Sequence, residues 1–288
     1  MKDCLILIND KAGKCRRCSV ENVQKAIGEE GENYRYSTLH LPTNKPINYD
    51  KYDAVAVCGG DGTLQIIMQQ IYTTDKTIYY FPCGTLNDKA GAEKYCHATS
   101  TPHPVTIGKA DGHVFTYVFA AGAFTEIGYT ASQKSKRRFG VVAYLIKVLR
   151  AYRVNRICCK IETDGKTYQD AYNLVMLVKS PRCFGFHFNK IFDERDEGGH
   201  LLLIPSPKHD GLVGIVEMFF PFFKVFFVGL KKEEDSNGIT FKRVKDLTMT
   251  LKDKVDFCVD GEKLTVSGVT KINFEKTKCR VKIIKVTR

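Results

Sequence analysis

The first third of the chain contains three short apolar runs, at Cys4–Ile8, Ala54–Cys58 and Thr77–Phe81. Continuous apolar runs of this length are typical of strands that are buried on both faces of a sheet. Two helices are expected between them: Ser19–Glu29, with Ser19 as its N-cap, and Thr63–Tyr72, where apolar residues recur at helical spacing. Because strands that alternate with helices form parallel sheets, this segment is predicted to be a doubly wound α/β domain.

The rest of the chain has a different pattern, in which strand-like runs dominate and one helix is expected over Gly140–Tyr152. The Ser, Thr and Pro residues of Thr99–Pro104 indicate a domain boundary. We therefore expect an α/β domain over residues 1–104 and a β-sandwich over residues 105–280, with a tail at 280–288 that returns to the first domain. The strand-like runs are Val114–Ala120, Ile157–Glu162, Ala171–Lys179, Leu201–Pro205, Leu247–Leu251, Val255–Val259 and Lys282–Val286.

The chain carries a formal net charge of +12, which attracts phosphates of nucleotides, nucleic acids or anionic lipids. No recognised nucleic-acid motif accompanies the charge, so we expect no nucleic-acid partner. Eleven cysteines without a secretion signal at the start indicate free thiols in a reducing compartment. The C-x-x-C pair Cys15 and Cys18 lacks a second ligand pair, which favours structural thiols over a zinc site.

The sequence Gly59-Gly60-Asp61-Gly62-Thr63 follows the second apolar run and opens the next helix. It therefore lies at the carboxyl end of a parallel strand, where open α/β sheets bind ligands. Glycines allow a close backbone approach, and amides at a helix start can hold a phosphate. A tight turn would explain the glycines as well, but it would not need Asp61. A carboxylate beside phosphate requires a cation, so Asp61 suggests Mg²⁺.

Two further loops follow the other apolar runs. Pro82–Asp88 (PCGTLND) offers Thr85 and Asn87 as hydrogen-bonding groups for phosphate or ribose, and Asp88 as a second carboxylate. Asn9–Lys14 follows the first run. Because parallel strands end at one edge of a sheet, the three loops are expected to converge.

Together these motifs resemble the diacylglycerol kinase catalytic-domain family, in particular its soluble bacterial lipid kinases. That family carries G-G-D-G-T, matched by Gly59–Thr63, and P-x-G-T-x-N-D, matched by Pro82–Asp88. It carries an N-P-x-x-G type loop near the start, matched by Asn9–Gly13, and D-G-E far downstream, matched by Asp260–Glu262. On local sequence alone, Asp260-Gly261 is also a favoured hairpin turn.

The resemblance implies an ATP-dependent kinase that transfers the γ-phosphate to the hydroxyl of diacylglycerol or a related lipid alcohol. It implies that Asp61 and Asp88 organise Mg²⁺, that Asp61 takes part in catalysis and that Glu262 is the general base. The family also holds a structural Mg²⁺ in an acidic turn, here with Glu197 as a ligand, although a solvated turn fits equally well. The implied nucleotide contacts are Asn9, Gly13, Thr38, Gly59, Gly60, Gly62, Thr63, Gly84, Thr85 and Asn87.

The resemblance further implies a cytoplasmic enzyme that attaches to the inner face of the membrane through anionic phospholipid headgroups. The β-sandwich would contribute the lipid side. Basic residues at Lys134–Arg138 are one candidate for this contact. Six phenylalanines between Phe219 and Phe227 are another, and they are equally compatible with a core segment. The oligomeric state, including a homodimer, stays open.

Two alternatives remain at this point. An NAD kinase would also carry G-G-D-G-T, but the Pro82–Asp88 motif and the phenylalanines argue against it. A catalytically altered homologue that only binds nucleotide or lipid is suggested by Gln65 and Ile66, by Lys89 and by Thr106, which depart from the family pattern. The retention of both aspartates and of Glu262 argues for an enzyme.

Overall fold

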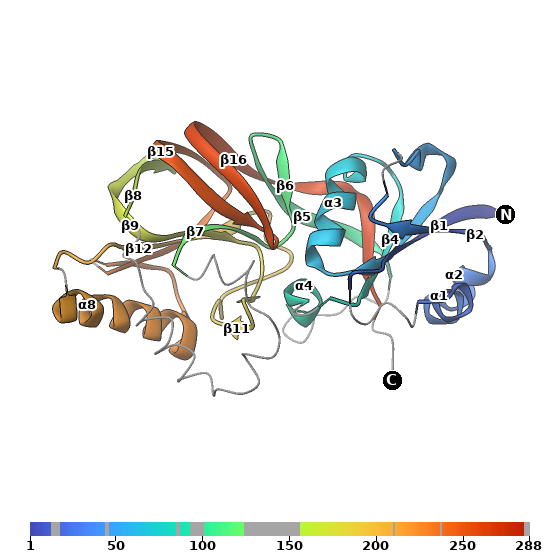
Figure 1. The fold of residues 1–288 in the computed structure, drawn as a ribbon, viewed down its shortest axis with the longest axis horizontal. Helices are drawn as coiled ribbons and strands as arrows, with labels where there is room; N and C mark the ends of the chain where they lie inside the picture. The colour runs from blue at the N-terminus through green and yellow to red at the C-terminus, as the bar shows by residue number, and fades with distance from the viewer. Residues whose placement is uncertain are drawn as a thin grey trace. The chain divides into compact units, whose positions relative to one another are not determined.

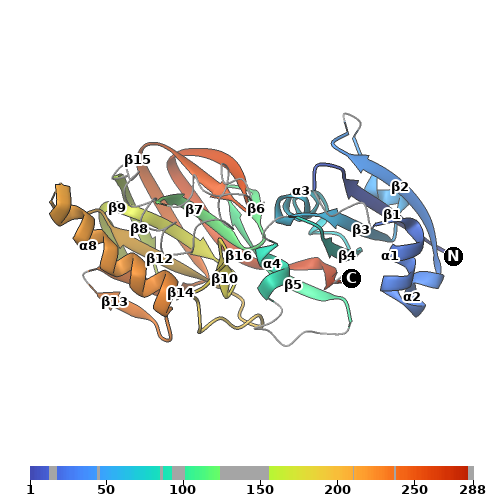
Figure 2. The same cartoon turned by 60° about the horizontal axis from the view of Figure 1, so that its bottom comes forward.

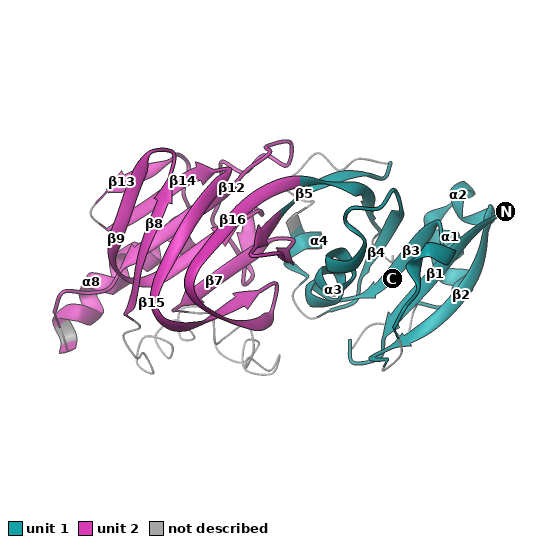
Figure 3. Cartoon of the chain, turned by 90° about the horizontal axis from the view of Figure 1, so that it is seen from above, with its two compact units in different colours: residues 1–107, 276–288 teal, residues 108–275 magenta. Residues whose placement is uncertain are grey.

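The computed structural model describes residues 1–12, 18–43, 46–84, 87–92, 101–123, 156–209, 211–236 and 238–284. The chain divides into two compact units, residues 1–107 with 276–288 as unit 1 and residues 108–275 as unit 2 (Figure 3). The expected helix over Gly140–Tyr152 and the basic cluster Lys134–Arg138 lie outside the described residues. So do the predicted nucleotide contacts Gly13 and Thr85.

Unit 1 is built on a parallel sheet with strand order β2-β1-β3-β4-β16. The predicted mixed α/β fold is therefore confirmed. The last strand of this sheet comes from the far end of the chain, where Arg280–Ile283 of β16 pair with β4. The strands are β1 (Lys2–Asn9), β2 (Tyr34–Leu41), β3 (Ala54–Gly59), β4 (Thr77–Pro82) and the end of β16 (Glu262–Ile283), and the helices are α1 (Val20–Ile27), α2 (Glu29–Glu32), η2 (Tyr49–Lys51), α3 (Asp61–Ile71) and α4 (Asp88–Ala92).

The central strands form where the apolar runs predicted them: β3 is buried along its whole length and β1 over Cys4–Ile8. Helix α1 starts as expected at Ser19, whose hydroxyl accepts a hydrogen bond of 3.2 Å from the Asn22 N–H. Strand β2 was not anticipated. It pairs with β1 and has several exposed side chains, so its sequence lacks a continuous apolar run.

Unit 2 consists mainly of antiparallel strands in the order β13-β14-β12-β9-β7-β15-β16, with β8 joining β15 and β9. Strand β5 pairs with β6 and β16, and the short strands β10 and β11 form a separate hairpin. The bounds are β5 (His103–Ala110), β6 (His113–Phe115), β7 (Val118–Gly122), β8 (Ile157–Thr163), β9 (Lys166–Val178), β10 (Arg182–Cys183), β11 (Phe186–His187), β12 (Gly199–Pro205), β13 (Glu234–Ser236), β14 (Ile239–Val244) and β15 (Asp246–Val259).

Two hydrophobic cores stabilise unit 2. One gathers Phe115, Phe119 and Phe257, with the rings of Phe119 and Phe257 stacked at 4.3 Å. The other lies beneath α8 (Gly211–Phe223) and its π-helical continuation η4 (Lys224–Val228), where Phe222 and Phe226 pack with strand residues. Figures 1 and 2 show α8 running along the strands of this unit. The phenylalanine-rich segment is thus helical and partly core.

Several predicted strand boundaries were wrong, and two of these differences have a clear structural cause. The run Val114–Ala120 is divided between β6 and β7, because a buried carboxylate from another hairpin binds the amides of Thr116 and Tyr117. The runs Leu247–Leu251 and Val255–Val259 belong to the single strand β15, whose pairing register shifts between them. Within the described ranges, no helix combines the length and the apolar character needed to cross a membrane.

Candidate active site

The loop after β1 is tied directly to the start of α3. The side-chain amide of Asn9 donates a hydrogen bond of 2.8 Å to Thr63 Oγ1. Its Oδ1 accepts from the Lys11 N–H at 3.0 Å, and its carbonyl accepts from the Ala12 N–H at 2.9 Å. Asn9 therefore shapes its own loop and fastens it to the G-G-D-G-T turn, although the two segments are far apart in sequence.

The two glycine loops touch through their backbones. A Cβ atom placed on Gly84 would lie 2.6 Å from the Gly60 Cα, a distance that side-chain carbons do not adopt. A Cβ on Gly59 would lie 2.6 Å from Thr63 Oγ1. The Cys83 N–H donates to the Gly59 carbonyl at 2.7 Å. At Gly59 and Gly84, glycine is therefore needed because of close packing, since neither residue has a positive φ.

The carboxylates of the two motifs lie at neighbouring helix starts. Asp61 opens α3 and its side chain accepts from the Tyr80 hydroxyl at 3.0 Å and from the Asp88 N–H at 2.6 Å. Asp88 opens α4 and is fully buried. The backbone bond between them brings the predicted metal ligands of both loops together at the carboxyl edge of the sheet.

This donor set fits a magnesium ion that is shared with a substrate. Mg²⁺ in proteins is commonly held by one or two carboxylates, with phosphate oxygens and waters completing its shell. Asp61 and Asp88 supply two carboxylates beside loops that can take phosphate. Among the described residues, no group of three or more His, Cys, Asp and Glu side chains gathers that could hold a metal alone.

Asn87 supports the second loop from within. It adopts a φ of 47°, a left-handed conformation that Asn tolerates better than most residues, and its side-chain amide donates to the Gly84 carbonyl at 2.8 Å. Its own carbonyl accepts from the Gly91 N–H at 2.8 Å. Because its side chain holds the loop closed, the role of Asn87 visible in the structure is to shape the loop.

Thr38 stands apart from these loops. It lies inside β2, paired with Ile6 and three residues before the strand ends at Leu41. Its side chain is exposed. The structure therefore groups Asn9, Gly60 and Thr63 with the second loop but does not bring Thr38 to them.

The acidic turn that contains Glu197 is rich in ion pairs. Glu197 is exposed and pairs with Lys245 at 3.2 Å, while Asp196 pairs with Arg243 at 3.1 Å. The buried ammonium of Lys179 donates to the backbone carbonyl of Asp196. A cation thus already occupies the inner side of this turn, which favours an ion-paired turn over a metal site.

The carboxylate of Asp260 sets the geometry of the D-G-E hairpin. Asp260 and Gly261 have φ values of 51° and 101° and connect Val259 to its pairing partner Glu262. The expected hairpin turn is therefore present. Glu262 is exposed at the first position of β16.

The Asp260 side chain turns inward and is buried, with only 2% of its surface exposed. It accepts from the N–H groups of Thr116, of Tyr117 at 3.0 Å and of Val118 at 2.9 Å, and from the Thr116 hydroxyl at 2.8 Å. Burial raises the pKa of the Asp260 carboxyl above its usual range, while these donors act in the opposite direction. Asp260 thereby fixes the turn that presents Glu262.

Two partners of the site were missed in the sequence. Tyr80 lies in an apolar strand and gave no sign that its hydroxyl would bind Asp61. The anchoring role of Asp260 was hidden because its amide partners are distant in sequence and have no side-chain signature. The only signal in the sequence was that Asp260 is an acidic residue in an Asp-Gly turn pair next to an apolar run.

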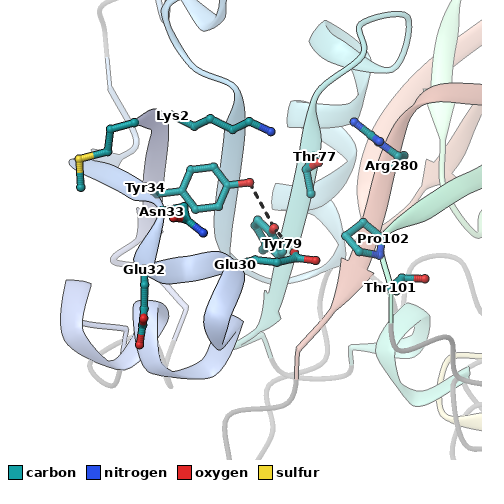
Figure 4. Close-up of a pocket in the computed structure, with 11 residues that line it drawn as sticks. Lys2, Glu30, Glu32, Asn33, Tyr34, Thr77, Tyr79, Thr101, Pro102 and Arg280 are labelled. Atoms are coloured by element: carbon teal, nitrogen blue, oxygen red, sulfur yellow. Dashed lines mark hydrogen bonds between the residues drawn. The ribbon is translucent and has the colours of Figure 1, made fainter.

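A pocket of about 840 Å³ lies elsewhere in unit 1. Lys2, Tyr34 and Thr77 are among the residues that line it (Figure 4). They lie near the amino ends of their strands, at the edge of the sheet opposite the glycine loops. The Tyr34 and Tyr79 hydroxyls lie 3.3 Å apart, and Tyr79 donates to Glu30 at 2.8 Å. Because parallel sheets bind ligands at the carboxyl edge, this pocket is not part of the candidate site.

Comparison with known proteins agrees with the motifs. Residues 3–104 match the family described as the diacylglycerol kinase catalytic domain. A protein of Streptococcus pneumoniae serotype 4 named "Putative lipid kinase" is 25% identical over 228 residues, which cover 71% of this chain and 74% of that protein. A diacylglycerol kinase of Staphylococcus carnosus is 30% identical over 167 residues, 54% of each chain.

The fold is also found among solved structures. A diacylglycerol kinase from Bacillus anthracis str. Sterne superposes with a TM-score of 0.65 at 20% identity, covering 97% of this chain and 96% of that one. At this identity the likeness concerns the fold. The match of residues 3–104 to the diacylglycerol kinase catalytic domain and the names of these relatives confirm the resemblance that the motifs predicted.

Proposed function

We propose that this protein is an ATP- and Mg²⁺-dependent kinase that phosphorylates the hydroxyl of diacylglycerol or a related lipid alcohol. The observation that carries the proposal is the junction of three loops at one sheet edge, through Asn9 and Thr63, Gly60 and Gly84, and Asp61 and Asp88. The names of the relatives support a lipid as the acceptor. NAD remains the alternative acceptor.

The proposed nucleotide contacts are the glycine loops and the side chains that flank them. The backbone amides at the start of α3 can donate hydrogen bonds to a phosphate, and the helix dipole favours negative charge at this end of the helix. Because Gly60 and Gly84 pack against each other without side chains, phosphate oxygens would have close access to the backbone. In this proposal Gly59, Gly60, Gly62, Thr63, Gly84, Thr85 and Asn87 contact or shape the nucleotide site, together with Asn9 and Gly13. Thr38 is left out of the proposed site because it lies inside β2, apart from these loops.

Asp61 and Asp88 are the proposed carboxylates for Mg²⁺. Bound there, the ion would neutralise phosphate charge that develops during transfer. The role of the chain itself is to hold Asp61 in place, and the Tyr80 hydroxyl and the Asp88 N–H do this through the two oxygens of its carboxylate. Glu197 is not proposed as a metal ligand, because its side chain already pairs with Lys245.

Glu262 is the proposed general base. Its carboxylate would take the proton from the acceptor hydroxyl while the hydroxyl oxygen attacks the γ-phosphorus. The bond between the γ-phosphorus and the bridging oxygen breaks, and ADP leaves with that oxygen. The buried bonds of Asp260 keep the backbone of the turn fixed, so that Glu262 is presented from a rigid support.

We further propose that the two compact units are the functional domains, a nucleotide-binding domain and a β-sandwich that contributes the lipid side and the base. The enzyme would act on its substrate in the cytoplasm, at the inner face of the membrane. The net charge of +12 supports attraction to anionic headgroups.

The test is transfer of labelled γ-phosphate from Mg-ATP to a panel of lipid alcohols in mixed micelles, with NAD as a parallel acceptor. Asp61→Asn and Glu262→Gln should abolish the transfer, and the exposed Asp253→Asn should leave it unchanged. Label on NAD alone would refute the lipid kinase and favour an NAD kinase. Transfer to no acceptor, with nucleotide still bound, would refute it in favour of a binding homologue.

A further inference from the structure

Helix α8 is apolar on both its buried and its exposed face. Met218 and Phe222 are each 2% exposed and pack into the core of unit 2. On the other side, Val216 and Phe220 are 54% and 65% exposed, and Phe223 is 41% exposed. A helix at the surface of a soluble protein ordinarily carries polar residues on its outer face.

These outer residues form one continuous stripe. Val213, Val216, Phe220 and Phe223 are spaced by three or four positions, so they share one face of the helix. The ring of Phe223 stacks on that of Phe219 at 5.6 Å and on that of Phe227 at 5.3 Å. The stripe, called here the α8 face, is therefore an ordered apolar surface. Apolar patches of this kind mark sites of interaction.

The length of the helix limits what the α8 face can contact. Helix α8 has 13 residues, whereas a span across a bilayer needs about 20. A short helix with aromatic residues on its outer face can instead lie in the plane of a membrane interface, with that face among the acyl chains. Its opposite face keeps its contacts with the protein core.

Cationic side chains surround the α8 face. Lys224 lies on the helix with its side chain 49% exposed, and its ammonium is paired with Glu234. Lys190 donates to the Val228 carbonyl at 2.5 Å, which places its ammonium at the end of η4. Lys231 and Lys232 follow η4 and are exposed, and Lys208 is exposed just before α8. Positive charge therefore borders both ends of the helix.

The neighbouring acidic groups are engaged within the protein. Glu217 accepts from His209 at 2.7 Å and from the Lys208 N–H at 2.9 Å. Glu234 accepts from Lys224 at 2.5 Å, and Glu233 accepts from the Arg243 N–H at 3.1 Å. These contacts reduce the repulsion that carboxylates would exert on an anionic surface.

We infer that the α8 face is the membrane-docking surface of this protein and that its partner is a bilayer rich in anionic phospholipid. Charge complementarity selects this partner, because a second copy of the chain would present the same positive border and a net charge of +12. The inference rests on the proposed function in one respect: a kinase with a lipid acceptor has to reach that lipid in a membrane. Docking itself requires no catalysis.

The absence of tryptophan from the sequence allows a site-specific optical test. Phe220→Trp places a single reporter on the α8 face, and Val269→Trp places a matched reporter at a position on β16 that is 61% exposed. Both full-length variants are titrated with vesicles of phosphatidylcholine alone and of phosphatidylcholine with phosphatidylglycerol. We expect a blue shift and quenching by brominated acyl chains for the first reporter with anionic vesicles only. Equal shifts for both reporters, or none for Phe220→Trp, would overturn the inference.

Co-sedimentation with the same anionic vesicles tests whether vesicle binding is lost when the α8 face is altered. Phe220→Glu should weaken vesicle binding at least tenfold, while Val269→Glu should leave it unchanged. If Phe220→Glu instead splits a dimer of the wild type and vesicle binding persists, the α8 face joins two copies and the inference is wrong.

Kinase assays separate this result from the proposed function. Phe220→Glu should keep phosphorylation of a short-chain, monomeric diacylglycerol and lose phosphorylation of the lipid in vesicles. If the wild type binds vesicles through Phe220 but phosphorylates no lipid, docking stands and the proposed activity fails. If it phosphorylates monomeric lipid but binds no anionic vesicle, the activity stands and docking fails.

Discussion

The backbone N–H of Asp88 donates a hydrogen bond of 2.6 Å to the Asp61 side chain, so that the first residue of α4 is fixed to the first residue of α3. Each aspartate comes from a different glycine motif. The bond therefore links the two loops, and removal of the Asp61 carboxylate would affect both of them, whereas a side-chain change at Asp88 keeps the N–H donor.

The charge and the hydrogen bonds of Asp61 can be separated by mutation. Asp61→Asn keeps an oxygen that can accept from Asp88 but removes the negative charge, so we expect a loss of kinase activity of at least about 100-fold with little unfolding. Tyr80→Phe removes one hydrogen bond and should lower the free energy of unfolding by about 1 kcal/mol with most activity kept. Activity measured across Mg²⁺ concentrations and urea unfolding distinguish the two effects. Equal activity losses in both variants would contradict this division.

The contact between the two glycine loops predicts that Gly84→Ala is destabilising. Its Cβ would lie 2.6 Å from the Gly60 Cα, and the adjacent hydrogen bond from the Cys83 N–H to the Gly59 carbonyl holds the two loops together. We expect a loss of about 2 kcal/mol or more in the free energy of unfolding and weak nucleotide binding. Gly238→Ala is the control, since its Cβ would meet only Pro221 at 3.7 Å. Calorimetry with and without nucleotide measures both quantities.

Asp260 and Glu262 should respond differently to loss of charge. Asp260→Asn places an amide NH₂ group against backbone donors, so we expect it to lower the free energy of unfolding by about 2–4 kcal/mol and to reduce kcat by displacing the turn. Glu262→Gln should keep stability and nucleotide binding while kcat falls. Thermal melting and steady-state kinetics provide the comparison, and a stable, active Asp260→Asn would show that the turn needs no anchor.

Burial of His200 predicts an acid-sensitive stability. Burial lowers the pKa of His200 from about 6.5 to about 3, with Arg243 and Lys179 adding to the effect. Below pH 6.5 the unfolded chain binds a proton that the folded chain refuses until about pH 3. The free energy of unfolding should therefore fall as the pH drops through this window, by up to about 1.4 kcal/mol per pH unit from this residue.

The variant His200→Phe keeps an aromatic ring on Phe241, whose ring centroid lies 5.1 Å from that of His200, and removes the titrating group. Its stability should depend less steeply on pH between 6 and 4 than that of the wild type. Replacing the exposed His113 by Phe serves as the control and should keep the wild-type slope. Identical slopes for all three proteins would show that His200 does not titrate in this way.

The elements of the fold that depend on a local residue pattern could be predicted from the sequence. Continuous apolar runs indicate buried parallel strands, and β1, β3 and β4 were predicted correctly for this reason. Strand β2 was missed because its exposed, polar side chains hide a strand that only its pairing with β1 defines. Helix α8 was missed because a segment that is apolar on every side has no helical period to detect.

The candidate site was predictable where motifs are contiguous and hidden where contacts are distant. The G-G-D-G-T loop and its aspartate are visible in five residues. The bond from Tyr80 to Asp61 and the clamp of Asp260 on the amides of Tyr117 and Val118 depend on tertiary structure alone. Backbone amides carry no sequence signature, so no inspection of residue types reveals them.

The last strand of the unit 1 sheet has a consequence for how the protein is made. During synthesis β4 leaves the ribosome long before Arg280–Ile283, its partner in β16. Until translation reaches those residues, one edge of β4 lacks its native neighbour and exposes unpaired backbone groups. Unit 1 can therefore complete its sheet only after the whole of unit 2 has emerged, although most of unit 1 is encoded first.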